Sequence, residues 1–136
     1  MRAIVFCGEG KHFTAGLDLS SAADMQALRS NGEDKDPARA GFDFFSTVKP
    51  LQDAVSSLEK VRVPVIAAIH GLCIGAGVDL CSTADIRIAS KCAKFTIKEV
   101  DIGLAADIGT LQRFQKVVGN DSWTRELAYT ARFFSP

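Results

Sequence analysis

The feature that most constrains the fold is a continuous apolar run, Val63-Pro64-Val65-Ile66-Ala67-Ala68-Ile69, which a glycine-rich turn follows at once. An apolar run of this length, with β-branched residues and no polar alternation, is typical of a strand buried on both faces. The turn occupies residues 71–77, and a helical stretch to about Thr83 comes after it. A buried strand that leads through a tight turn into a helix predicts an α/β fold.

The rest of the chain alternates strands and helices in the same way. Further strands are predicted at Ala3–Cys7, Asp85–Ala89 and Lys94–Ile97. One helix is predicted from a cap at Ser20 or Ser21 to about Arg29. A second is predicted over Thr110–Val118, with Gly119 as its stop, and a third from a cap at Asp121 or Ser122 through Thr130. Residues 31–39 are rich in charge and predict a loop, and no internal sequence repeat is visible.

A long helix is predicted from Ala38 to Lys60, because apolar side chains recur there three and four positions apart. The members of this stripe are Phe42, Phe45, Val48, Leu51, Val55 and Leu58. Helical spacing of this kind favours packing against the core over a groove for a partner. Pro50 predicts a kink or a division of the helix.

Length and charge limit what the chain does. Its 136 residues leave room for one domain, residues 1–136. Sixteen basic side chains balance sixteen acidic ones, so no net field attracts nucleic acid or an anionic membrane. The apolar N-terminal stretch is too short for a signal peptide or a membrane span. The four cysteines match no zinc-ligand spacing, so we expect reduced thiols and an intracellular compartment.

Two glycine-rich turns each follow a predicted strand: Ala15–Leu19 and Gly71–Gly77. Glycine allows close approach to a ligand, and free N–H groups at a helix start favour an anionic oxygen. Two such donors from separate turns would form an oxyanion hole. The alternative is tight packing of strand against helix, and the pattern alone leaves both open.

Three carboxylates lie among small or apolar neighbours: Asp79, Glu99 and Asp107. A buried carboxylate is costly unless it is paired or protonated, and converging acids separate their pKa values into a proton donor and a proton acceptor. The structural alternatives are helix-dipole contacts for the two aspartates and ion pairing of Glu99 with Lys98 or Lys94.

Together these segments resemble a known family. Phe13–Leu19, Pro64–Gly71, Gly75–Leu80 and Ala84–Arg87 resemble the crotonase (enoyl-CoA hydratase/isomerase) superfamily, and the match spans nearly the whole chain. Within it, Lys98–Arg113 is similar to the Δ3,5-Δ2,4-dienoyl-CoA isomerase branch. The resemblance implies a spiral of ββα turns, here in partial form.

The resemblance also implies a binding site. The carbonyl of an acyl-CoA thioester would lie between the peptide N–H groups of Leu17 and Ala76. The acyl and pantetheine path would be lined by Ala15, Gly16, Leu17, Asp18 and Leu19. CoA is then part of the substrate, and no metal or other cofactor is implied.

The three acids fall where the isomerase branch carries its active-site acids. In the implied reaction, 3,5-dienoyl-CoA becomes 2,4-dienoyl-CoA in the β-oxidation of unsaturated fatty acids. One of Glu99 and Asp107 would take the proton from carbon 2 and the other would protonate carbon 6. Asp107 is favoured as the base, the reverse assignment stays open, and Asp79 would bias their protonation states. A 2-enoyl-CoA hydratase, the nearest alternative, would usually carry glutamate at position 79 and no acid at 107.

The family comparison sets three further expectations. Regions common in the family would precede Met1 and follow Pro136, so we expect a domain incomplete at both ends. The full-length protein would form trimers or hexamers in the mitochondrial matrix or the peroxisome. A non-catalytic fragment that binds acyl-CoA or other subunits is the alternative from a different functional class.

Overall fold

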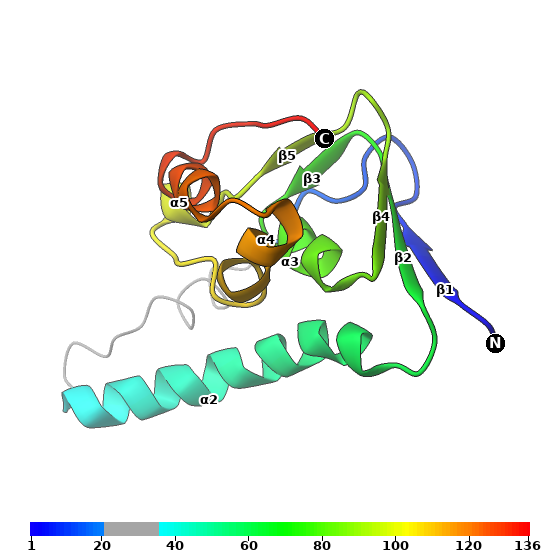
Figure 1. The fold of residues 1–136 in the computed structure, drawn as a ribbon. Coiled ribbons are helices and arrows are strands. Elements are labelled where there is room, and N and C mark those ends of the chain that lie inside the picture. The colour runs from blue at the N-terminus through cyan, green and yellow to red at the C-terminus, as the bar shows by residue number, and fades with distance from the viewer. Residues whose placement is uncertain (21–35) are drawn as a thin grey trace.

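The computed structural model describes residues 1–20 and 36–136 of the chain (Figure 1). The helix predicted up to Arg29 and most of the loop predicted at 31–39 lie outside the described residues. Residues 37–39 of that loop belong instead to helix α2.

The strands form two small parallel sheets. The first has the order β1 (Ile4–Cys7), β2 (Val65–Ile69), β4 (Ile86–Ala89), and the second pairs β3 (Leu72–Ile74) with β5 (Lys94–Thr96). In the first sheet Ile66 lies between Val5 and Ile86. The structure adds β3 to the strands predicted from the sequence.

One structural unit occurs twice along the chain. β2 joins the first sheet, β3 joins the second, and α3 (Ala76–Thr83) follows; then β4, β5, the short 3₁₀ helix η2 (Glu99–Ile102) and α4 (Thr110–Val118) repeat that order. The segment after β1 also reaches the second sheet, through a parallel bridge between Thr14 and Cys73. These ββα turns confirm the α/β class predicted from the sequence.

The core lies between the first sheet and the helices α3, α4 and α5 (Asp121–Thr130) (Figure 1). Val65, Ala67 and Ile69 point into it and are almost fully buried, as are Val78 of α3 and Leu127 of α5. The expectation that β2 is buried on both faces is wrong for its other face, where alternate residues are partly exposed. No element among the described residues covers that face.

Helix α2 (Pro37–Ser56) runs along one side of the molecule and continues into the 3₁₀ helix η1 (Ser57–Lys60) (Figure 1). Pro50 lies within α2 and does not divide it. The expected core packing of its apolar stripe is largely wrong: Val48 is buried, whereas Phe42 and Phe45 are 70% and 59% exposed. In the first half of α2, Ala40 is buried, while the large apolar side chains remain mostly exposed.

Helix ends follow local signals. α4 stops at Gly119, which adopts the left-handed conformation at φ 69°. α5 is capped by Asn120, whose side chain accepts a hydrogen bond from the N–H of Trp123. The predicted cap at Asp121 or Ser122 is therefore displaced by one or two positions.

Candidate active site

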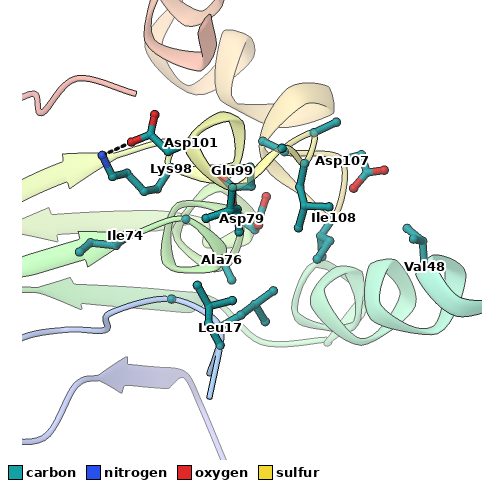
Figure 2. Close-up of a pocket in the computed structure, with 18 of the residues that line it drawn as sticks. Leu17, Val48, Ile74, Ala76, Asp79, Lys98, Glu99, Asp101, Asp107 and Ile108 are labelled. Atoms are coloured by element: carbon teal, nitrogen blue, oxygen red, sulfur yellow. Dashed lines mark ion pairs between the residues drawn. The ribbon is translucent and has the colours of Figure 1, made fainter. Parts of the chain in front are cut away.

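A cavity of about 700 Å³ opens between the two glycine-rich turns, α2 and the segment that precedes α4 (Figure 2). Most of the predicted site residues line it: Ala15, Gly16, Leu17, Leu19, Ala76, Asp79, Glu99 and Asp107. Asp18 is absent from the lining. Its carboxylate accepts a hydrogen bond from the N–H of Ser20 at 2.9 Å, so it shapes the turn instead.

Backbone pairing brings the two glycine turns together. Thr14 donates its N–H to the carbonyl of Leu72 at 3.0 Å, and the N–H of Ile74 donates to the carbonyl of Thr14 at 3.2 Å. A side chain at Gly77 would collide with the methyl group of Thr14. The tight packing that was one of the two alternatives for these turns is therefore present. It also fixes one turn against the other.

Each of these turns contributes to the cavity lining a residue whose backbone N–H is unpaired within the described residues. Gly75 has φ 52°, a conformation that favours glycine, and it leads into Ala76 at the first position of α3. Within the described part of the chain, the N–H groups of Leu17 and Ala76 donate to no other group. Leu17 and Ala76 both line the cavity (Figure 2), so two unpaired donors are available to a ligand oxygen there.

Asp79 lies on α3 and is 1% exposed. Its carboxylate accepts the N–H of Thr110, the first residue of α4. Burial raises the pKa of Asp79 and Asp107 adds to that, while the hydrogen bonds from Thr110 and Gly109 oppose the rise. Asp79 therefore makes the helix-dipole contact that was one of its structural alternatives, at the start of α4, and it also lines the cavity.

Glu99 begins η2 and carries the most perturbed carboxyl of the cavity. Burial, followed by the nearby charges of Asp79 and Asp107, raises its pKa to about 7. Its Oε2 atom is buried and has no hydrogen-bond partner among the described residues. The alternative ion pair with Lys98 is not formed, because Lys98 pairs with Asp101 (Figure 2).

Asp107 is half-buried on the segment between Gly103 and α4. Its main-chain carbonyl accepts a hydrogen bond from the Nε2 of Gln52 on α2 at 2.9 Å. Phe44 and Val48 of α2 also line the cavity. The sequence reasoning missed this contribution of α2. For the two apolar residues a signal was present, since positions 44 and 48 lie four apart on one helical face.

The other candidates for chemistry have structural contacts. His70 bonds the carbonyl of Gly10 through Nε2, and His12 accepts the N–H of Leu72 at Nδ1. Cys73 and Cys81 are buried with their sulfur atoms 3.7 Å apart. Among residues 1–20 and 36–136, no group of three His, Cys, Asp or Glu side chains is placed to hold a metal ion. The described helices are all too short or too polar to cross a bilayer.

Comparison with known proteins identifies the family of the chain. The profile of the enoyl-CoA hydratase/isomerase family matches residues 1–136. The chain is 50% identical over 131 residues to the mitochondrial Δ(3,5)-Δ(2,4)-dienoyl-CoA isomerase of Pongo abelii, covering 96% of this chain and 39% of that protein. It is 47% identical to the peroxisomal enzyme of Arabidopsis thaliana, covering 97% and 46%. The chain thus spans less than half the length of these relatives.

Solved structures of related proteins share the fold. A putative enoyl-CoA hydratase from Thermobifida fusca YX, in complex with acetoacetyl-CoA, superposes with a TM-score of 0.78 at 33% identity, covering 98% of this chain and 51% of that one. A putative enoyl-CoA hydratase from Streptomyces coelicolor A3(2) gives a TM-score of 0.79 at 28% identity, covering 99% and 46%.

Proposed function

Because this chain belongs to the enoyl-CoA hydratase/isomerase family, we propose that its cavity carries out the isomerisation of 3,5-dienoyl-CoA to 2,4-dienoyl-CoA. One observation supports this most directly: two unpaired backbone donors and three carboxyl groups line the same cavity. The identity of about half to dienoyl-CoA isomerases supports the choice within the family.

The backbone donors bind the thioester. The carbonyl oxygen accepts hydrogen bonds from the N–H groups of Leu17 and Ala76, and these bonds strengthen as negative charge develops on that oxygen. Removing a proton from carbon 2 produces an extended enolate that carries this negative charge on the thioester oxygen. Stabilising it lowers the barrier to the first proton transfer.

The carboxyl groups move the protons. Asp107 takes the proton from carbon 2, and Glu99 gives a proton to carbon 6, so that the two double bonds shift into conjugation with the thioester. A pKa raised to about 7 leaves a substantial protonated fraction of Glu99 at neutral pH, which supports its role as the donor. The proton on Asp107 then returns to Glu99 through solvent before the next turnover.

Asp79 acts through its neighbours. Its charge raises the pKa of Glu99, and its contact with Thr110 holds the start of α4 and thereby the segment that bears Asp107. The step transfers protons and no electrons, so it needs no redox cofactor, and CoA enters as part of the substrate.

The cellular setting is proposed from the relatives. Their names place them in mitochondria and in peroxisomes, which supports one of these compartments for this protein. We also propose that the assembled protein is a trimer or hexamer. The apolar side chains of Val5, Ile86 and Ile88, exposed on the outer face of the first sheet, supply surface that a subunit contact would cover.

The test follows the ultraviolet absorbance of 3,5-dienoyl-CoA mixed with the purified chain. A shift to longer wavelength is expected as the diene enters conjugation. Asp107→Asn, which removes the proposed base, should slow the reaction by about 10²- to 10⁴-fold.

A 2-enoyl-CoA substrate separates the alternatives. Formation of 3-hydroxyacyl-CoA without isomerase activity, unaffected by Asp107→Asn, would identify a hydratase instead. Tight binding of an acyl-CoA, with neither product, would identify a binding module.

A further inference from the structure

One stripe of α2 and η1 contacts both the cavity and the start of α4. Its members follow at four- and three-residue spacing: Phe44, Val48, Gln52, Ser56 and Glu59. The first two line the cavity, and the last three carry hydrogen-bonding side chains. The stripe thus changes from apolar to polar where α2 passes the segment that bears Asp107.

The polar half of this stripe holds that segment at two points. Gln52 donates to the carbonyl of Asp107 at 2.9 Å. Arg113 of α4 donates to the carbonyl of Gly109 at 3.3 Å, and it is itself fixed by two 2.7 Å hydrogen bonds to Glu59 and one of 2.8 Å to Ser56. The bonds that Gln52, Ser56 and Glu59 make to this region each link positions more than 50 residues apart in sequence.

The Gln52 contact is specific in its chemistry. A main-chain carbonyl only accepts hydrogen bonds, so its partner must be a donor. The amide NH₂ of Gln52 is such a donor, whereas an ionised glutamate of the same shape would have none. The carboxylate of Asp107, in contrast, makes no hydrogen bond within the described residues. Its position therefore depends on its backbone, and the backbone carbonyl of this residue is held by Gln52.

We propose that Gln52 is a positioning residue for the reaction, which fixes the main chain of Asp107 so that its carboxylate keeps its place in the cavity that Glu99 also lines. Gln52 touches neither carboxyl group and acts through the peptide that carries one of them. This role rests on the proposed function for its catalytic consequence. Its structural consequence is independent of turnover.

The experiment compares Gln52→Met with the unaltered chain and with Gln115→Met. Methionine keeps the length of the side chain and removes the donor. Gln115 is a half-buried glutamine of α4 whose side chain makes no hydrogen bond within the described residues, so its variant controls for the substitution itself. Amide exchange and the ¹³C titration of Glu99 are measured by NMR, and turnover of 3,5-dienoyl-CoA is measured by absorbance.

The amide of Thr110 donates to the carboxylate of Asp79, and that of Leu111 donates to the carbonyl of Ala106. In Gln52→Met both amides should exchange about fivefold faster. The pKa of Glu99 should fall, because the charge of Asp107 is no longer held near it. The turnover number should drop about fivefold with the Michaelis constant unchanged.

Wild-type exchange rates together with an unchanged Glu99 titration in Gln52→Met would overturn the proposal. Equal effects in Gln115→Met would overturn it as well, since they would reveal a general response of the helices. If the unaltered chain shows no isomerase activity, the proposed function fails, and exchange and titration still decide the role of Gln52.

Discussion

The raised pKa of Glu99 makes a prediction about folding as well as catalysis. Its carboxyl group lies in a cavity that two other carboxyl-bearing residues also line, and burial is the first cause of a pKa of about 7 against an ordinary value of 4.5. Glu99→Gln keeps the shape of the side chain and removes the titration. The variant should therefore be more stable than the unaltered chain at high pH.

The sign follows from proton binding in the two states. Between pH 4.5 and 7 the folded chain keeps the Glu99 proton and the unfolded chain loses it, so stability falls as pH rises through this window. At about 1.4 kcal/mol per pKa unit, the full rise corresponds to about 3 kcal/mol as an upper limit. Because the carboxyl is partly open to solvent in the cavity, screening reduces the expected penalty to about 2 kcal/mol.

Urea unfolding at pH 5 and pH 8 measures this penalty. The free energy of unfolding of Glu99→Gln, relative to the unaltered chain, should increase by about 2 kcal/mol between the two pH values. Glu9→Gln, at an exposed turn after β1, provides the control for removing one negative charge from this chain.

The reasoning would be refuted if the free energies of unfolding of Glu99→Gln and of the unaltered chain differed by the same amount at pH 5 and at pH 8. It would mean that Glu99 ionises in the folded protein as it does in the unfolded chain. The proposed proton donor would then be deprotonated at neutral pH.

Three further changes test the packing and charge of the site. Asp79→Asn removes a charge that raises the pKa of Glu99, so that pKa should fall below about 7 in a ¹³C NMR titration. Gly109→Ala places a Cβ 2.8 Å from the Cβ of Asp79, so thermal unfolding should show a loss of stability of about 1–3 kcal/mol. The control is Gly41→Ala, which adds a Cβ in open space on α2 and should not destabilise the chain. Arg113→Lys loses the two-pronged ion pair at the start of α4 and should cost about 1 kcal/mol in urea unfolding.

Local signals predicted most of the fold. The strands β2, β4 and β5 follow from short apolar or β-branched runs, and α4 ends at a glycine that adopts the left-handed conformation. β3 was missed because three residues between glycines show no periodicity. The repeated ββα unit leaves no repeat in the sequence, since each copy packs against different neighbours and so selects different side chains.

Periodicity failed for the first half of α2. A stripe of apolar residues at helical spacing shows which face of a helix is apolar, and it does not show that another segment covers that face. Phe42 and Phe45 fit the pattern as well as Val48 does, yet only Val48 is buried. Burial depends on neighbours that are distant in sequence, which the spacing cannot report.

The acids of the site were predictable, and the group that holds one of them was not. Asp79, Glu99 and Asp107 are unusual because they lie among small and apolar residues, and the structure brings all three to one cavity. Gln52 is an ordinary residue in a polar stretch, and its partner is a main-chain carbonyl 55 positions away. A carbonyl is present at every residue, so no residue type marks the contact.

Helix α3 makes the two halves of the site depend on each other. Its first residue, Ala76, supplies one of the backbone donors, and Asp79, almost one turn later, holds the start of α4. Gly77 packs against Thr14 beside the other donor, and Gly109 packs against Asp79. A displacement of α3 would therefore move the proposed donor for the thioester oxygen and the segment bearing Asp107 together. Substitutions that loosen either glycine contact should impair carbonyl binding and proton transfer in parallel.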